Sequence, residues 1–427
     1  MKVISSTDRT FKNMVKRATS RSSPQSAKVD NSVRTILKAV QRAGDSAVAR
    51  YTKKFDRVSL KPAQFRVGPE QVKEAYYKIR KDEGDALRYA AQRITSFHER
   101  QRTRTWMYQD DGATLGQMIQ PLDAVGLYVP GGKAVYPSTI LMTAIPAKVA
   151  GVPRVVMCTP PSREGISPYL LVAADIAGVN EIYQIGGVQA IGAMAYGTKT
   201  LARVDKVVGP GNLYVAAAKR MIYGDVDIDM VAGPSELLVL ADESANPSHV
   251  AADLLCEAEH DEEAQVFLVT PSARLARQVV GEIQSRLKKL SRAKILAKSL
   301  AHHAMAFVVE SLDEAIDLAN DIAPEHLTLS VDRPFDYLER IRHAGALFLG
   351  RYTPPAVADY VAGPNHVLPT GGTARFFSPL SQDDYVKKSN IISYSKEELS
   401  KVRHYVARMS QMEGLDAHGQ SMESRYS

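Results

Sequence analysis

The feature that most constrains this fold is an alternation that begins near residue 124. Short runs of apolar, β-branched residues are followed by amphipathic stretches and by turns rich in glycine and proline. This βαβ rhythm is typical of parallel sheets covered by helices, so we predict an α/β protein. The predicted strands lie at residues 125–129, 154–158, 181–185, 206–208, 236–240, 265–270, 305–309 and 346–349.

Glycine-rich breaks near residues 131 and 209–233 divide the predicted strands into two groups. The sequence therefore predicts two incomplete Rossmann-like parallel-sheet domains, one nested in the other. The nested domain spans 128–235, and the outer domain combines 1–127 with 236–380. Apolar spacings near 3.6 predict helices in the N-terminal segment. Residues 381–427 are predicted to form a helical C-terminal segment, with helix from 384 to 412.

The composition excludes several classes of protein. No apolar stretch reaches the length of a membrane span, and an amphipathic leading helix around Phe11 and Met14 is favoured over a transit peptide. Two cysteines, Cys158 and Cys256, cannot form a disulfide framework in 427 residues, which favours a reducing cytoplasm. The net charge of +7 is spread along the chain without a basic run, so it favours anionic cofactors and substrates over nucleic acid.

Three glycine-containing turns each follow a predicted strand and precede a predicted helix, at residues 129–133, 185–189 and 208–212. Glycine lets the backbone approach a ligand, and the following helix offers free N–H groups. Three such turns at the carboxyl ends of successive strands predict a nucleotide crevice. None is a complete G-x-G-x-x-G motif, so ordinary tight turns remain the alternative for each one alone.

Metal-binding residue types occur next to one another after residue 255. Glu257 and His260 stand at positions i and i+3, which would place them on one face of a helix and able to grip one ion. A surface pair is the alternative for so short a pattern. Cys256 is interpreted as a small buried helix residue and not as a nucleophile.

An acid and an imidazole follow one another at Glu325 and His326. The preceding helix is predicted to open with a capping box, Ser311 with Glu314, and to stop at Pro324, leaving both residues on a loop. Such a pair suits proton transfer near neutral pH, although two solvated loop residues are the alternative. Further polar islands lie at residues 359–369 and 413–418.

Taken in order and spacing, these motifs resemble the histidinol dehydrogenase family, and the resemblance covers nearly the whole chain. The stretches that carry it are residues 128–132, 136–139, 185–190, 208–219, 228–236, 258–260, 323–327, 363–370 and 413–418, with 44–56 also fitting.

The resemblance implies a set of functional residues. His326 would take the hydroxyl proton, and Glu325 would activate water for attack on the aldehyde. Glu257, His260, Asp359 and His418 would bind zinc, and Mn²⁺ could take the place of the zinc ion. Contacts to NAD would come from Tyr128, Gln189 and Asn212. Contacts to the substrate would come from Ser235, Glu257, His260, His326, Asp359, His366, Glu413 and His418.

The resemblance also implies an assembly and a reaction. The family forms an intertwined homodimer, so Glu413 and His418 would act in the partner's site. The reaction would convert L-histidinol, two NAD and water to L-histidine, the last step of histidine biosynthesis. Two alternatives stay open: a paralogue acting on another polar alcohol, such as a sulfonated or phosphorylated diol, and a nucleotide- or nucleic-acid-binding protein without catalysis.

One position departs from the family pattern, because Glu257 stands where the family usually has glutamine. A carboxylate makes the site one charge more negative, holds a metal more strongly and lowers its Lewis acidity. We expect Glu257→Gln to weaken metal retention and to change turnover, measured as zinc content after dialysis and as initial rate. Unchanged zinc content and turnover would contradict this interpretation.

Overall fold

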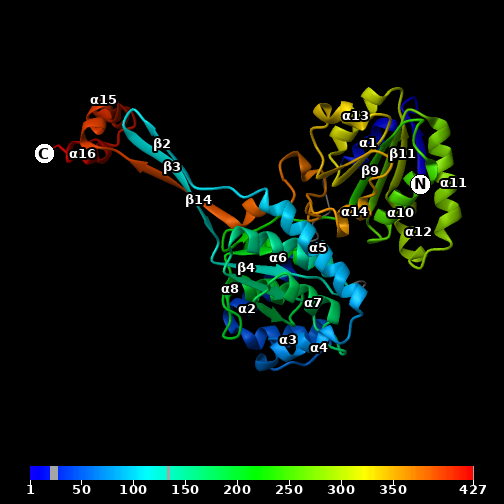
Figure 1. The fold of residues 1–427 in the computed structure, drawn as a ribbon, viewed down its shortest axis with the longest axis horizontal. Coiled ribbons are helices and arrows are strands. Elements are labelled where there is room, and N and C mark those ends of the chain that lie inside the picture. Colours follow the sequence, from blue (N-terminus) through cyan, green and yellow to red (C-terminus); the bar gives the residue numbers. More distant parts are fainter. Residues whose placement is uncertain (20–26, 132–134, 427) are drawn as a thin grey trace.

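The computed structural model describes residues 1–19, 27–131 and 135–426. Within these ranges the chain forms two parallel sheets covered by helices and one antiparallel sheet of three strands. Figure 1 shows the parallel sheets as two neighbouring bodies, while the antiparallel sheet is an arm that leads away from both toward the C-terminus. The predicted α/β class with two parallel sheets is confirmed.

The first parallel sheet has the strand order β1-β11-β10-β9-β12-β13. Successive side chains of a strand point to opposite faces. In β9, Leu237 and Val239 accordingly join the apolar cluster under α10, α11 and α12, whereas Leu238 and Leu240 join the cluster under α1 and α13. The strands are β1 (Lys2–Ser5), β9 (Glu236–Ala241), β10 (Gln265–Thr270), β11 (Ala304–Val308), β12 (His326–Ser330) and β13 (Ala346–Leu349). The helices are α1 (Phe11–Ala18), α10 (Pro247–Ala258), α11 (Ala273–Leu287), α12 (Ala293–His302) and α13 (Leu312–Ile322).

The second parallel sheet has the strand order β6-β5-β4-β7-β8. Its central strand β4 is buried throughout, with Val125 and Leu127 on one face and Ala124 and Tyr128 on the other. The strands are β4 (Ala124–Tyr128), β5 (Arg154–Cys158), β6 (Glu181–Tyr183), β7 (Lys206–Val208) and β8 (Asp227–Ile228). One face carries α2 (Ala27–Ala43), α3 (Asp45–Phe55), α8 (Gly187–Tyr196) and α9 (Leu213–Ile222). The other carries α4 (Pro69–Tyr76), α5 (Lys81–Glu99), α6 (Pro137–Ala150) and α7 (Pro168–Ile176).

The helices from α2 to α5 pack on this second sheet, although the sequence grouped residues 1–127 with the outer domain. The apolar face of α2, with Val33, Ile36 and Val40, lies in the same cluster as the buried side chains of α8. Helical periodicity shows that a face is apolar, but it does not show which sheet that face covers. Only β1 and α1 of the N-terminal segment pack with the six-stranded sheet in the described residues.

The arm is built from distant parts of the chain. Its strands are β2 (Trp106–Asp110), β3 (Ala113–Pro121) and β14 (Val386–Ser393), in the order β14-β3-β2. At its tip lie α15 (Lys396–Met412) and α16 (Asp416–Glu423) (Figure 1). The prediction of helix from residue 384 was therefore wrong at its start. Strand β14 has no buried residue and is held by pairing with β3, so it carries no alternating apolar pattern.

The prediction of a loop at His326 was also wrong. Ala323 adopts a left-handed conformation with φ of 53° that ends α13 before Pro324. The chain then enters the sheet between β9 and β13, so His326 begins a strand where the sequence predicted a loop. Leu327 and Leu329 are the apolar residues of this strand, and so short a run gives little strand signal.

None of the helices in the described residues has both the length and the apolar character needed to cross a membrane.

Candidate active site

Two acidic side chains and one imidazole meet at the edge of the six-stranded sheet where β9 and β12 begin. Glu257, Glu325 and His326 are 4%, 7% and 5% exposed. Nδ1 of His326 lies 3.4 Å from Oε2 of Glu257 and 3.8 Å from Oε2 of Glu325. One ligand atom from each residue lies within 4.8 Å of the others, which is close enough to hold one metal ion.

The backbone of β9 orients both residues of the acid–imidazole pair. The N–H of Glu236 donates to Oε2 of Glu325 at 2.9 Å, and the carbonyl of Glu236 lies 3.1 Å from Nδ1 of His326. With its proton on Nδ1, the imidazole donates to this carbonyl, and Nε2 is then the basic nitrogen. Sequence reasoning missed the role of Glu236, since a backbone contact leaves no residue-type signal.

His260, Asp359 and His366 extend the same site. Asp359 lies on α14 (Pro355–Tyr360), which packs against α10. Burial raises the pKa of the Asp359 carboxyl, the charges of His326 and His260 oppose this rise, and the charge of Glu257 adds to it. Nδ1 of His366 lies 3.1 Å from the carbonyl of Asp359. Burial lowers the pKa of His366 to about 4, so this ring is neutral at physiological pH.

One helix does not carry both Glu257 and His260, as the sequence predicted. Helix α10 ends at Ala258, and the N–H of His260 donates to the carbonyl of Glu257 in the turn that follows. Both residues still lie near Asp359, since the charges of Glu257 and His260 both shift the pKa of its carboxyl group. Ser235 is half-buried and directly precedes Glu236, so it lies beside the strand that orients Glu325 and His326.

The electrostatics of the site favour a bound cation. Burial, followed by the charge of Glu257, raises the pKa of Glu325 well above its usual value. Burial raises the pKa of Glu236 to about 7. Oε1 of Glu257 and Oε2 of Glu236 are buried and have no hydrogen-bond partner among the described residues. A divalent ion would offset these charges, so the residues fit the metal that the resemblance implies.

Two further residues predicted for this site, Glu413 and His418, lie elsewhere in the chain. Glu413 caps the end of α15 and His418 belongs to α16, and both are exposed. Figure 1 shows these helices at the tip of the arm, far from α10 and β9. The structure of one chain therefore does not bring Glu413 and His418 to the site of that same chain.

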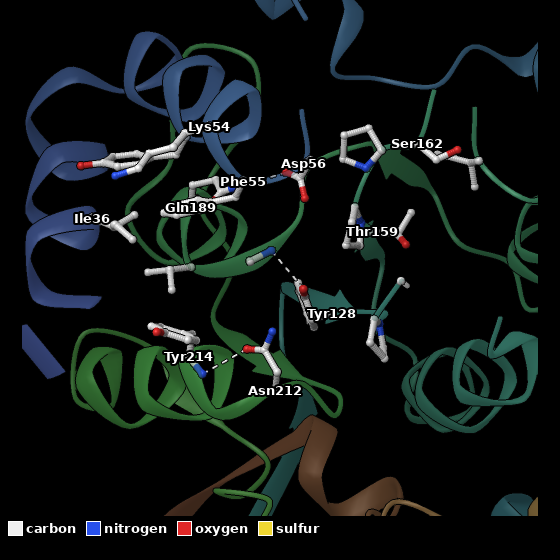
Figure 2. Close-up of a pocket in the computed structure, with 18 of the residues that line it drawn as sticks. Ile36, Lys54, Phe55, Asp56, Tyr128, Thr159, Ser162, Gln189, Asn212 and Tyr214 are labelled. Atoms are coloured by element: carbon white, nitrogen blue, oxygen red, sulfur yellow. Dashed lines mark hydrogen bonds between the residues drawn. The ribbon is translucent and has the colours of Figure 1, made fainter. Parts of the chain in front are cut away.

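A second feature is a cleft at the carboxyl edge of the five-stranded sheet. It has a volume of about 1370 Å³, and the predicted cofactor residues Tyr128, Gln189 and Asn212 all line it. Figure 2 shows Gln189 on one side, Asn212 on the other and Tyr128 between them. Gly132 and Lys133 of the first glycine turn lie outside the described residues.

Hydrogen bonds order the polar groups of the cleft. The N–H of Gly187 donates to the Tyr128 hydroxyl at 3.0 Å, and Nε2 of Gln189 donates to Oδ2 of Asp56 at 3.3 Å (Figure 2). Asn212 caps α9 by accepting from the N–H groups of Tyr214 and Val215. Sequence reasoning assigned Asp56 no role, although burial in this cleft raises its pKa to about 6. Its place after an amphipathic helix gave no separate signal.

Comparison with known proteins identifies the family. The model of the family described as histidinol dehydrogenase matches residues 19–426. The chain belongs to the histidinol dehydrogenase family. It is therefore an oxidoreductase.

Relatives and a solved structure of the histidinol dehydrogenase family agree over almost the full length. The histidinol dehydrogenase of Syntrophotalea carbinolica is 52% identical over 398 residues, which are 93% of this chain and 92% of that one. A Bacillus cereus histidinol dehydrogenase is 50% identical, with the same shares of the two chains covered. The crystal structure of histidinol dehydrogenase from Elizabethkingia anophelis is 35% identical, with a TM-score of 0.94 over 100% of this chain and 98% of that chain.

The raised pKa of Glu325 predicts a pH dependence of stability in chelated protein. At a pH between the usual pKa of 4.5 and the raised pKa of Glu325 in the folded state, the folded state holds a proton that the unfolded chain has lost. The free energy of unfolding must then fall as the pH rises through this window. We expect Glu325→Gln to reduce this fall, measured by thermal denaturation at about pH 5 and about pH 8.

The conservative change Glu310→Gln, at an exposed residue outside the cluster, serves as the control. An equal fall in Glu325→Gln and in the unaltered protein would contradict the assignment of this slope to Glu325.

Proposed function

We propose that this protein oxidises L-histidinol through L-histidinaldehyde to L-histidine, with two NAD as hydride acceptors and one Zn²⁺ per subunit. This would be the last step of histidine biosynthesis. The observation that carries the proposal is the pairing of Glu325 and His326 in one buried cluster with the carboxylate of Glu257. Membership of the histidinol dehydrogenase family supports the choice of substrate.

The metal site would consist of Glu257, His260 and Asp359, with His418 of the partner subunit as the fourth ligand. Carboxylate oxygen and imidazole nitrogen together suit Zn²⁺ and, less well, Mn²⁺. A bound ion would supply charge for orienting the amino alcohol. The unpartnered Oε1 of Glu257 supports its role as a ligand.

His326 is the base for the first oxidation in this proposal. Loss of hydride from the alcohol carbon requires that the hydroxyl proton leave at the same time or before. Nδ1 of His326 is occupied by the carbonyl of Glu236, so Nε2 takes this proton. The hydride passes to NAD, and the product of this step is the aldehyde.

Glu325 is the base for the second oxidation. Conversion of the aldehyde to a carboxylate needs the oxygen of water, and the proton of that water must be accepted as the C–O bond forms. A carboxyl group with a raised pKa holds such a proton more readily than an exposed one does. Burial of Glu325 supports this assignment. The second hydride then leaves the hydrated carbon for the second NAD.

NAD would occupy the cleft lined by Tyr128, Gln189 and Asn212. The N-termini of α8 and α9 begin at this cleft, and the free N–H groups of a helix start favour phosphate. Ser235 and His366 would contact the substrate from this chain, together with Glu257, His260, His326 and Asp359. Glu413 and His418 of the partner subunit would complete the set.

The proposed assembly is a homodimer that exchanges its C-terminal segments. The arm carries α15 and α16 away from the rest of the chain, with Glu413 and His418 exposed at its tip (Figure 1). Trp106, Met107 and Tyr108 of β2 are about half exposed, which suits burial against a second chain. We propose no nucleic acid or membrane as a partner, and we place the enzyme in the cytoplasm because Cys158 and Cys256 are unpaired.

The reaction is tested by measuring NADH with purified protein, NAD and L-histidinol. We expect two NADH per histidinol, loss of activity on chelation and recovery when zinc is added. Folded, zinc-loaded protein that forms no NADH from histidinol would contradict the proposed substrate. The departure at Glu257 would then favour the paralogue, and sulfonated and phosphorylated diols would be assayed next.

The exchange of C-terminal segments is tested by mixing two inactive variants, His326→Ala and His418→Ala. In a mixed dimer, one site carries both defects and the other carries neither. The site without a defect is therefore active. Random reassociation should recover about a quarter of the unaltered activity. Mixing His326→Ala with Glu325→Ala is the control, because both defects lie in the same part of the site. No recovery in the first mixture, despite reassociation shown by tagged copies, would contradict the exchange.

A further inference from the structure

A buried ion pair binds the turn that leads to Asn212 in the cleft. Lys219 belongs to α9, and Asp229 follows β8, the neighbour of β7 in the sheet. Their side chains are 2% and 1% exposed, and Nζ of Lys219 is paired with Oδ1 of Asp229. Two buried charges carry a large desolvation penalty, and an apolar pair of similar volume often gives equal or greater stability. The position of the pair therefore needs a reason other than stability.

The pair binds both backbone polar groups of Gly209. Nζ of Lys219 donates to the carbonyl of Gly209 at 2.8 Å, and the N–H of Gly209 donates to Oδ2 of Asp229 at 2.8 Å. Gly209 has φ of 112°, and an added Cβ would lie 2.2 Å from the carbonyl oxygen of Tyr128. The ion pair therefore binds the turn through both backbone polar groups of Gly209, and the turn lies against Tyr128 at the end of β4.

The same carboxylate also binds the start of the connection between the two sheets. Oδ1 of Asp229 accepts from the N–H of Met230 at 2.7 Å, where the chain leaves β8 for β9. Farther along, the N–H of Gly233 donates to Oγ1 of Thr370 at 2.6 Å. This connection ends at Glu236, whose backbone orients Glu325 and His326.

The ion pair is thus shared by two segments with different roles. One is the turn 209–212, which ends with Asn212 in the cleft. The other is the connection 229–235, which leads to β9, the strand whose first residue orients Glu325 and His326. A hydride donor and acceptor must meet within a few tenths of an ångström of the reactive separation, so the relative position of these segments matters for the reaction.

We propose that Lys219 and Asp229 are positioning residues, which hold the cofactor turn in register with the connection to β9. The inference rests on the proposed function, because it takes the cleft to be the NAD site. Neither residue touches the reacting atoms. They act through Gly209 and Met230, whose backbone groups they bind.

The test is the double variant Lys219→Met with Asp229→Asn. It removes both charges, so no unpaired buried charge remains, while the asparagine oxygen can still accept one N–H. We expect the dissociation constant of NAD, measured by calorimetry without substrate, to rise roughly tenfold or more. The melting temperature and zinc content should change little, and kcat should fall more than the KM for histidinol rises.

Arg154→Met is the matched control. Arg154 pairs with Glu181 at the amino edge of the same sheet, away from the cleft, and its side chain is 24% exposed. We expect this variant to lower the melting temperature without changing the affinity for NAD. Asp229→Asn alone is the second test variant if the double variant does not fold.

The outcomes separate the inference from the proposed function. An unaltered protein that does not bind NAD contradicts the proposed function. An unaltered protein that binds NAD, together with a folded double variant of equal NAD affinity and kcat, overturns the positioning role. A double variant that loses only thermal stability, as Arg154→Met does, also overturns it.

Discussion

Acidic side chains are buried where β9 and β12 begin, and the groups around them must compensate for their loss of water. Glu236, Glu257 and Glu325 are all buried there, and a carboxylate removed from water is stable only with protons, N–H donors or a cation. The backbone supplies two donors, from Glu236 to Glu325 and from Gly371 to Glu236. The remaining charge is what makes the cluster suited to a metal and to proton transfer. Burial of these carboxylates lowers stability locally, since each loses its contact with water.

Much of the fold could be predicted from the sequence because buried parallel strands consist of short apolar, β-branched runs. Each of the eight predicted strands overlaps an observed one. Of the strands that were missed, β14 has no buried residue and β8 has only two residues, so both are held by pairing with a neighbouring strand. Strand β12 was missed although it is buried throughout, because its apolar run is short and follows closely on Pro324. The assignment of α2 to a sheet also lay beyond the sequence, since Val33 and Val40 can pack on any apolar surface.

The candidate site was predictable where residue types carry the chemistry and not where backbone groups do. Glu257, Glu325 and His326 stood out by their types and spacing, but their roles came from the resemblance to the histidinol dehydrogenase family. The structure brings the three side chains within one cluster. The contribution of Glu236 was hidden because its N–H and carbonyl act, and any residue has these groups. The helix end at Ala258 was equally hidden, since no glycine or proline follows it directly. Long-range register, here of β12 with β9, decides such contacts.

The arm has a consequence for the order in which the chain matures. Strand β14 pairs with β3 through Val386 opposite Pro121, so the third strand of the arm is synthesised long after the other two. Pairings so distant in sequence form late, because the intervening chain must be closed into a loop first. The tip helices α15 and α16 leave the ribosome after β14. In the proposed dimer, a nascent chain can therefore complete its cofactor cleft during translation, but it acquires turnover only once a second finished chain supplies its tail.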